Sequence, residues 1–443
     1  MHRKTQLFHP MMETASRRLR WHGELAPGHA RAAGVLTIGG VSVNELAQTY
    51  GTPSLILDGN VLDAAIGQFL DAAAPHEMEV AYAGKALLLT GLVRLMTQTR
   101  LTLDVCSLGE LNTAERGEMP AERITLHGCG KTNDELSAAV AGRVGRTVVD
   151  NLDELAALAA HGKPVRILLR INTGVTARTH AFVQTGGDDT KFGMTGRDFE
   201  TAAKLLRANP CLAFLGLHSH IGSQIFETAA FEANVAAMMD AAAKFTAWGL
   251  PVKEIVAGGG FGVEARPQDS ALNVPGVVNK IAAAVAEQAL RNGLAVPKIG
   301  LEPGRAIIAP AGTSLYRVMA KKQQAAHAFA VVDGGIADNP RPALYGAYHH
   351  AVLASRASNT GETRTIVCGR SCENDRMMEL DLPGDVRAGD LLAVCTTGAY
   401  TYSMASNYNR FAKPAVIYAK DGTHRLFARR ETIEDVLRND VDA

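Results

Sequence analysis

The sequence predicts an α/β protein with two parts, a (β/α)8 TIM barrel and a smaller C-terminal all-β domain of Greek-key or β-sandwich type. Between residues 79 and 302, eight short apolar segments recur, most of them separated by an amphipathic or alanine-rich helical segment. Past Ala311 this alternation stops, and strand-like runs follow one another with turn residues between them. We therefore expect a barrel over residues 52–311, a β domain over 312–443, and an N-terminal segment, 1–51, that pairs with the β domain.

The composition excludes several classes of partner. Hydrophobic residues make up 47% of the chain and charged residues 20%, which suffices for a core and argues against disorder. Lys plus Arg and Asp plus Glu number 45 each, so no net field favours nucleic acid or an anionic membrane, and a small molecule is the expected partner. No segment has the ~20 apolar residues of a membrane helix, and the N-terminus lacks the apolar stretch of a signal peptide. The thinly spread cysteines form no CxxC pair, which is typical of reduced thiols and predicts a cytoplasmic protein: Cys106, Cys129, Cys211, Cys368, Cys372 and Cys395.

The expected elements follow in chain order. Before the barrel, a strand is expected over 34–40, then a strand over 54–57 and a helix over 60–74. The eight barrel strands are expected at 79–83, 101–105, 123–127, 146–150, 165–171, 212–218, 254–257 and 298–302, and helices at 86–99, 134–141, 151–160, 198–208, 229–248 and 277–292. Strands of the β domain are expected at 327–333, 363–368, 391–396 and 415–418. An open doubly wound sheet is the alternative, but the GxGxxG fingerprint that would follow its first strand is missing.

Lys85 directly follows the first barrel strand, at the end where parallel α/β folds gather functional groups. Apolar surroundings lower the cost of losing an ammonium charge, so such an amine can be neutral enough to attack an aldehyde. A single lysine at a strand end is more often a side chain that lies along apolar neighbours with its charge in water. The role of Lys85 therefore depends on what the other strand ends carry.

Three further strand ends carry polar groups or bare backbone. The sixth strand runs into His218-Ser219-His220. Because no HExxH spacing or carboxylate partner accompanies these histidines, we do not expect them to bind a metal. We expect a histidine ring that stacks on a planar group or forms hydrogen bonds with carbonyl groups of the core. The seventh is followed by Gly258-Gly259-Gly260, whose N–H groups can crowd a phosphate, with a flexible turn as an equal alternative. The eighth ends in Glu302-Pro303-Gly304-Arg305, and one interpretation is a structural ion pair between Glu302 and Arg305. In the functional alternative, the Glu302 carboxylate binds a cationic ring nitrogen and the Arg305 guanidinium binds a phosphate or a carboxylate.

An amine, a stacking ring, a glycine cradle for phosphate and a carboxylate for a pyridinium nitrogen are the groups that pyridoxal 5'-phosphate requires. Their joint occurrence at strand ends is far less expected by chance than any one of them. The sequence therefore predicts a pyridoxal-phosphate site at the carboxyl end of the barrel.

From about Gly34 to Arg438 the chain resembles the diaminopimelate decarboxylases, which are pyridoxal-phosphate enzymes of the alanine-racemase-like fold class. The resemblance rests on Tyr82-Ala83-Gly84-Lys85-Ala86, Thr179-His180 with Asp189-Thr190-Lys191-Phe192-Gly193, the run from His218 to Gln224, Gly258-Gly259-Gly260, Glu302-Pro303-Gly304-Arg305, the run from Asp338 to Tyr345, Cys372-Glu373 and Gly398-Ala399-Tyr400. It implies a homodimer whose active sites are shared between subunits. One departure is His127-Gly128-Cys129-Gly130-Lys131, where the family commonly has two asparagines before the lysine; no catalytic group is lost by it.

Carried over residue by residue, the resemblance implies a role for each motif. The catalytic residues would be Lys85, His220 and Cys372, with Lys85 holding the cofactor aldehyde, His220 stacking on the ring and Cys372 reaching the site from the partner subunit. Cofactor binding would involve Lys85, His220, Ser223, Gly259, Gly260, Glu302, Gly304, Arg305 and Tyr400, and substrate binding Arg305, Arg341, Tyr345, Glu373 and Tyr400. No metal ligand is implied.

The activity implied is decarboxylation of meso-2,6-diaminopimelate to L-lysine and carbon dioxide, the last step of lysine biosynthesis. Arg341 would select a distal carboxylate, which favours this substrate over ornithine, arginine or a diamino acid of secondary metabolism. A barrel that binds the cofactor without turnover is a lesser alternative, and retention of Cys372 as a proton donor argues against it. Without the family, Cys372 reads more simply as a small hydrophobic residue. A racemase commonly pairs the pyridine nitrogen with arginine, so Glu302 argues against that activity.

Overall fold

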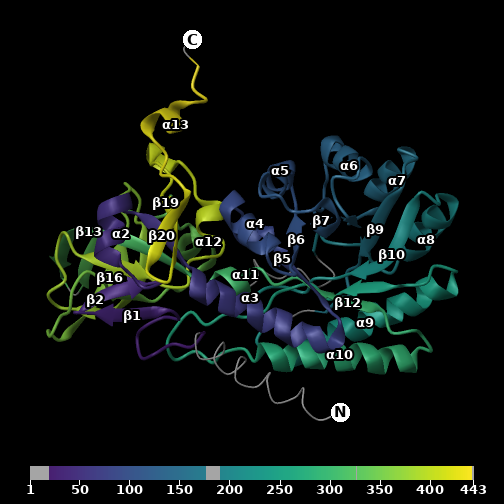
Figure 1. Cartoon of the computed structure of the whole chain (residues 1–443), viewed down its shortest axis with the longest axis horizontal. Coiled ribbons are helices and arrows are strands. Elements are labelled where there is room, and N and C mark those ends of the chain that lie inside the picture. The colour runs from purple at the N-terminus through teal and green to yellow at the C-terminus, as the bar shows by residue number, and fades with distance from the viewer. Residues whose placement is uncertain (1–18, 176–189, 326, 442–443) are drawn as a thin grey trace. The chain divides into compact units, whose positions relative to one another are not determined.

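The computed structural model describes residues 19–175, 190–325 and 327–441 (Figure 1). The chain divides into two compact units: unit 1 comprises residues 1–67, 263–271 and 305–443, and unit 2 comprises 68–262 and 272–304. The expected motif residues Thr179, His180 and Asp189 lie outside the described residues. In the described ranges, no helix is long and apolar enough to cross a membrane.

Unit 2 contains a closed barrel of eight parallel strands, which confirms the predicted fold class. Around the barrel the strands follow one another in chain order, and the last pairs with the first. They are β5 (Glu79–Ala83), β6 (Thr102–Val105), β7 (Ile124–Leu126), β8 (Arg146–Val149), β9 (Val165–Arg170), β10 (Leu212–His218), β11 (Glu254–Val256) and β12 (Lys298–Leu301). Each begins and ends within one residue of its predicted range, because most positions in these short segments are apolar and buried.

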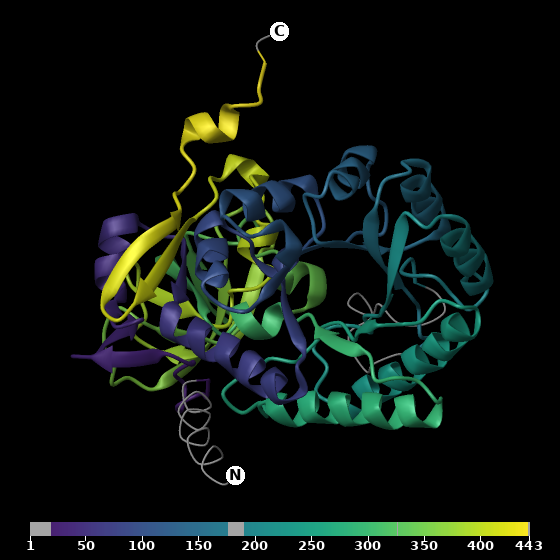
Figure 2. The same cartoon turned by 45° about the vertical axis from the view of Figure 1, so that its right-hand side comes forward.

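Helices lie outside the ring of strands (Figure 2). They are α4 (Thr90–Thr97), α5 (Leu108–Arg116), α6 (Asn133–Val140), α7 (Leu152–Ala160), α8 (Phe199–Ala208), α9 (Thr228–Ala247) and α10 (Val274–Arg291), with short 3-10 turns at Ala74–His76, Gly84–Ala86 and Ala121–Arg123. The helix expected from residue 86 is shorter than predicted and begins at Thr90. Leu87 is extended and its carbonyl accepts a hydrogen bond from the Tyr82 hydroxyl at 2.7 Å, so Lys85 lies in a turn rather than in a helix.

The main sheet of unit 1 has the strand order β17-β16-β14-β13-β4-β19-β20, and four of its strands, β13, β16, β19 and β20, are labelled in Figure 1. Its strands are β4 (Ser54–Asp58), β13 (Gly312–Gln324), β14 (His327–Val332), β16 (Glu362–Cys368), β17 (Arg376–Pro383), β19 (Ala415–Lys420) and β20 (Thr423–Ala428), with β15 (Ala351–Leu353) and β18 (Leu391–Val394) joined through β13. The boundary expected at residue 52 does not coincide with this arrangement. Strand β4 is hydrogen-bonded to β13 and β19 and belongs to the β sheet, not to the barrel.

The N-terminal strands form a sheet of their own, made of β1 (His29–Ala32), β2 (Val35–Ile38) and β3 (Val41–Ser42). Leu36 and Ile38 are fully buried in one core with Ile56 and Leu315 of the main sheet. The Leu36 N–H also donates to the Ala354 carbonyl at 2.8 Å. The early strand therefore joins the β domain by packing and by this hydrogen bond, without a ladder. The remaining elements of the unit are α2 (Val43–Tyr50), α3 (Gly59–Ala73), which runs from unit 1 into unit 2, α11 (Arg305–Ile308), α12 (Arg341–Tyr345), α13 (Ile433–Leu437) and 3-10 turns at Tyr402–Met404 and Tyr408–Arg410.

Candidate active site

The carboxyl ends of the barrel strands bring together the polar residues that the sequence singled out. Glu302 follows β12 and Lys85 follows β5, and these two strands are hydrogen-bonded neighbours. His220 follows β10 and the glycine run follows β11. Because the strands are parallel, their carboxyl ends open at one end of the barrel, where loops carry the chemistry in this architecture. The residues placed at this end of unit 2 are Lys85, His220, Ser223, Gly259, Gly260, Glu302 and Gly304.

The Glu302 carboxylate lies between two histidines. Its Oε2 accepts from His218 Nε2 at 2.9 Å, and its Oε1 lies 3.3 Å from His127 Nε2. The two imidazole rings meet edge to face, with centroids 5.1 Å apart. The sequence-based expectation that no carboxylate accompanies His218 is therefore wrong: Glu302 is 84 positions away in the chain but lies on a nearby strand end.

These contacts set the charge of each group. Although burial opposes ionisation, the two histidines hold the pKa of Glu302 well below its usual range. Burial likewise disfavours the His127 imidazolium, but the charges of Glu302 and Asp104 outweigh it and raise the pKa of His127 to about 9. Burial lowers the pKa of His218 to about 4, so this ring is neutral and donates its Nε2 proton to Glu302. At neutral pH the site thus holds a carboxylate beside one imidazolium. The ligand atoms of His127, His218 and Glu302 lie within 4.8 Å of one another, and a metal ion there would have to displace the proton of His127.

Asp104, at the end of β6, completes the cluster. Its Oδ1 lies 3.5 Å from His127 Nε2, and neither carboxylate oxygen has a hydrogen-bond partner among the described residues. Burial, followed by repulsion from Glu302, raises the pKa of Asp104 to about 6. Sequence reasoning missed both Asp104 and His127. The one available signal was their position at the carboxyl ends of the second and third predicted barrel strands.

His220 is held as a neutral ring. Its Nδ1 accepts a hydrogen bond from the backbone N–H of Gly259 at 3.2 Å, which leaves the proton of the neutral imidazole on Nε2. Burial, followed by the charges of Lys85 and Arg170, lowers the pKa of His220 well below its usual value. An uncharged imidazole fixed by backbone on one edge is suited to lie against a planar aromatic ring.

The glycine run is required by close backbone packing. Gly258 has a φ of 76° and Gly260 a φ of 94°, which L side chains rarely adopt. A Cβ on Gly259 would overlap the carbonyl oxygen of Glu302. The run therefore keeps bare backbone beside His220 and Glu302, which is the form that phosphate-binding loops take.

A buried ion pair supports the neighbouring strand ends. The Lys131 ammonium donates to Glu154 Oε1 at 2.6 Å, to the Val148 carbonyl at 2.6 Å and to the Gly128 carbonyl at 2.9 Å. The side chains of Lys131 and Glu154 are 1% and 4% exposed. Lys131 thus ties the loop that follows His127 to β8. In the sequence, Lys131 ends the motif from His127 to Lys131 that differs from the common family pattern, and nothing there indicated Glu154 as its partner.

Lys85 is an exposed residue in this single chain. It lies close enough to His220 for its positive charge to add to burial in lowering the pKa of that ring. Lys85 therefore projects at the same end of the barrel as the histidine that is expected to stack on the cofactor.

In unit 1, two arginines gather around one tyrosine. The guanidinium carbon of Arg305 lies 4.7 Å from the Tyr400 ring centre and that of Arg341 lies 5.7 Å from it; Arg341 is also 5.4 Å from the Tyr345 ring. Burial, followed by repulsion from Arg305, lowers the pKa of Arg341 to about 10. Among the described residues no carboxylate lies within ion-pair distance of Arg341. Tyr400 has a φ of 59°, a strained conformation that orients its ring. The arrangement is suited to a carboxylate ligand.

Cys372 and Glu373 lie in the loop between β16 and β17, and both are exposed. The Tyr408 hydroxyl donates to the Glu373 carboxylate. The structure therefore presents the Cys-Glu motif on the surface of unit 1.

The donor set in unit 2 fits pyridoxal phosphate. It supplies an amine, a neutral imidazole, bare glycine backbone and a buried carboxylate that stays ionised, and two oxygens of Asp104 and the Nδ1 of His218 are buried there without partners in the described structure. When bound, this cofactor supplies an electron sink for the bond that breaks at an amino-acid α carbon.

Comparisons with known proteins agree with this assignment. Residues 62–309 match the family model described as pyridoxal-dependent decarboxylase, pyridoxal binding domain. The chain is 41% identical to the diaminopimelate decarboxylase of Actinosynnema pretiosum subsp. auranticum over 413 residues, which cover 92% of this chain and 93% of that protein. It is 40% identical to the Bacillus subtilis (strain 168) diaminopimelate decarboxylase over 423 residues, 92% and 95% of the two chains. The crystal structure of the M. jannaschii diaminopimelate decarboxylase in complex with L-lysine superposes with a TM-score of 0.88 at 27% identity, covering 94% of this chain and 98% of that one. The chain therefore belongs to the pyridoxal-dependent decarboxylases, within the diaminopimelate decarboxylase family.

Proposed function

We propose that this chain is a pyridoxal-phosphate enzyme that removes the carboxylate at the D centre of meso-2,6-diaminopimelate to give L-lysine and carbon dioxide. The observation that carries the proposal is the buried Glu302 carboxylate, which two histidines keep ionised at the end of β12, next to the strand that leads into Lys85. A carboxylate in that state can hold a protonated ring nitrogen, and that proton is what makes the ring an effective electron acceptor.

We assign most of the cofactor contacts to residues of unit 2, and those of Arg305 and Tyr400 to unit 1. Lys85 would bind the aldehyde carbon, His220 would lie on the ring face, and Glu302 would hold the ring nitrogen. Ser223, Gly259, Gly260 and Tyr400 would contact the phosphate, with Gly304 and Arg305 beside them. His127 and His218 would act on the cofactor only through Glu302, by fixing its orientation and its charge.

Substrate recognition is assigned to the arginine cluster of unit 1. Arg341 has a planar guanidinium that binds a carboxylate through two parallel hydrogen bonds, and the nearby Arg305 charge favours an anion over a cation. A substrate with a second, distal amino-acid group satisfies this arrangement together with Glu373, whereas ornithine leaves the Arg341 guanidinium without an anion.

We further propose a homodimer with shared active sites, in which Cys372 and Glu373 serve the site of the partner subunit. Their exposure in the single chain supports this assignment, since a side chain that acts in another subunit must protrude from its own. Cys372 would then donate a proton to the α carbon after carbon dioxide leaves. The six cysteines are all free thiols, which supports the further proposal of a cytoplasmic location.

An absorbance spectrum of the purified protein, followed by parallel assays with meso-diaminopimelate and ornithine, tests the function. The expected outcome is a lysine-bound cofactor band in the visible or near ultraviolet, with L-lysine and carbon dioxide formed in equal amounts from diaminopimelate. A higher kcat/KM for ornithine would instead favour the alternative, a decarboxylase of another diamino acid. Cofactor binding without turnover of either would point to a non-catalytic barrel.

A further inference from the structure

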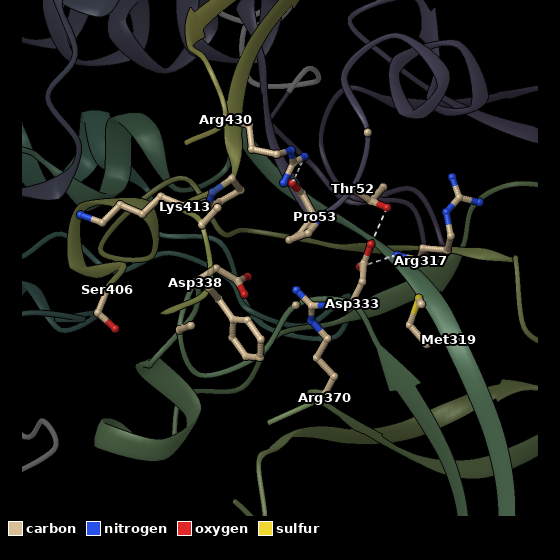
Figure 3. A pocket seen from close by; sticks show the side chains of 16 residues that line it. Thr52, Pro53, Arg317, Met319, Asp333, Asp338, Arg370, Ser406, Lys413 and Arg430 are labelled. Carbon is tan, nitrogen blue, oxygen red and sulfur yellow. Dashed lines mark hydrogen bonds between the residues drawn. The ribbon is translucent and has the colours of Figure 1, made fainter. Parts of the chain in front are cut away.

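A cavity of about 480 Å³ lies within unit 1 and is used by none of the roles assigned above (Figure 3). Its volume is in the range of sites that bind small molecules. We name it the β13 pocket and define it by its charged lining residues: Arg317, Asp333, Asp338, Arg370, Lys413 and Arg430.

None of the four cations of the β13 pocket has a carboxylate within ion-pair distance in the described parts of the chain. Arg370 is an exposed residue, and its guanidinium carbon lies 4.4 Å from the Phe411 ring centre. Arg430 donates to two backbone carbonyls, those of Pro53 at 2.6 Å and Tyr50 at 3.3 Å. Cations that are not neutralised by the protein leave a positive potential in the cavity.

The two carboxylates of the pocket do not cancel this charge. Asp333 accepts from the Thr52 hydroxyl and from the backbone N–H of Arg317. Asp338 accepts from the Tyr316 hydroxyl and from the Gly335 N–H, and burial raises its pKa to about 7. The pocket is thus lined by four cations and two carboxylates. Asp333 is already hydrogen-bonded to the protein, and Asp338 is partly protonated near neutral pH.

The orientation of the arginine side chains indicates where in the β13 pocket the positive charge is concentrated. In Figure 3, Arg430 enters from above and Arg370 from below, and both side chains are directed toward the centre of the view, where Arg430 donates to the Pro53 carbonyl. Lys413 and Arg317 extend toward the two sides. Two guanidinium groups that line one cavity from opposite sides can together bind the oxygens of a carboxylate or a phosphate.

We propose that the β13 pocket is a binding site for a small organic anion, a carboxylate or a phosphate ester, clamped between Arg370 and Arg430. This goes beyond the proposed function, because no residue of the pocket was assigned to cofactor or substrate. Arg370 precedes Cys372 by two positions in the loop between β16 and β17. Binding of the anion to Arg370 would therefore hold in place the loop that carries the Cys-Glu motif.

Calorimetric titration of the cofactor-loaded protein with succinate, with inorganic phosphate and with sodium chloride at matched ionic strength tests the proposal. Saturable binding of succinate or phosphate, with no heat of binding for chloride, is the expected result, and the tighter of the two names the anion class. Arg370→Ala should raise the dissociation constant of the anion about tenfold or more, because the charge-assisted hydrogen bonds of the Arg370 guanidinium are lost. Arg370 is exposed, so this variant should fold. Arg430→Lys, which keeps the charge but not the fork, should also weaken binding.

Two controls separate this site from the others. Arg387→Ala removes an exposed arginine outside the pocket and should leave the affinity unchanged. Arg341→Ala should likewise leave it unchanged, and an affinity lost with Arg341 but kept in Arg370→Ala would show that the anion occupies the substrate site. That result, or the absence of saturable binding, would overturn the proposal. It would also be overturned if Arg370→Ala dissociated the oligomer in sedimentation without any anion effect, because the pocket would then be covered by a second subunit.

Discussion

Replacement of His127 by glutamine tests the charge assignment at the heart of the site. Glutamine keeps a hydrogen-bond donor near Glu302 but cannot become cationic. The interval between the ordinary pKa of 6.5 and the value of about 9 in the folded protein corresponds to about 3 kcal/mol of folding free energy at about 1.4 kcal/mol per pH unit. His127 is only 15% exposed, so solvent does little to weaken this interaction.

The sign of the pH dependence follows from the direction of the pKa change. The pKa of His127 is higher in the folded protein than in the unfolded chain. Its stabilising contribution is therefore complete below about pH 6.5 and is lost as the pH rises through about 9. The stability difference between the wild type and His127→Gln should accordingly be largest at pH 6.5 and should approach zero at pH 9.5.

Thermal unfolding of the cofactor-free proteins at the two pH values measures this difference. For a unit of this size, about 3 kcal/mol corresponds to a lowering of Tm by about 6–12 °C at pH 6.5. His161→Gln is the matched control, because His161 is exposed and its removal should change Tm little at either pH. A Tm difference between wild type and His127→Gln that is equal at pH 6.5 and pH 9.5 would show that His127 is not the cation of the cluster.

Four further changes test the remaining assignments. Lys85→Ala should abolish the visible absorbance of the lysine-bound cofactor, and a band that borohydride still reduces would contradict its role. Cys372→Ala should slow turnover while the cofactor spectrum stays the same; mixing Lys85→Ala with Cys372→Ala chains should then restore part of the activity, and no recovery would mean that each subunit holds a complete site. Arg341→Lys should raise KM for diaminopimelate about tenfold or more with a smaller change in kcat, because the two-pronged hydrogen bond is lost. Lys131→Met should destabilise the protein by about 3–5 kcal/mol because it leaves the Glu154 charge buried, and the double variant with Glu154→Gln should recover much of the loss in urea unfolding.

The barrel could be predicted from the sequence because its signals are local. Each strand is a short and mostly buried segment, and the residues assigned to the chemistry lie at or directly after the carboxyl ends of these strands. Helix α6 begins at a capping box of Thr132 and Glu135 and α7 at the Asn151 cap, so these boundaries also followed from neighbouring residues. The same locality placed Lys85, His220 and Glu302 at one end of the fold.

The β domain was less predictable because its pairing is set by distant residues. All five residues of β4 are buried, as in a barrel strand, and only its partners β13 and β19 show that it belongs to the other unit. Strand β13 itself was not predicted. Its first half is buried and its end, from Lys321 to Gln324, is polar and partly or fully exposed, so the pattern has neither a uniform apolar run nor a regular alternation.

The state of Glu302 shows why a site can be located from the sequence while its chemistry stays hidden. An isolated carboxylate buried at a strand end would have a raised pKa and would be protonated, and it could not then hold a protonated ring nitrogen. It is ionised here because His218, at the end of β10, donates to one oxygen and His127, after β7, places a positive charge beside the other. Asp104, near the end of β6, in turn helps to keep His127 protonated. The anion that the proposed reaction needs is thus produced jointly by four strand ends that are far apart in the chain, and replacing any one of these side chains should change the charge on the others before it changes their positions.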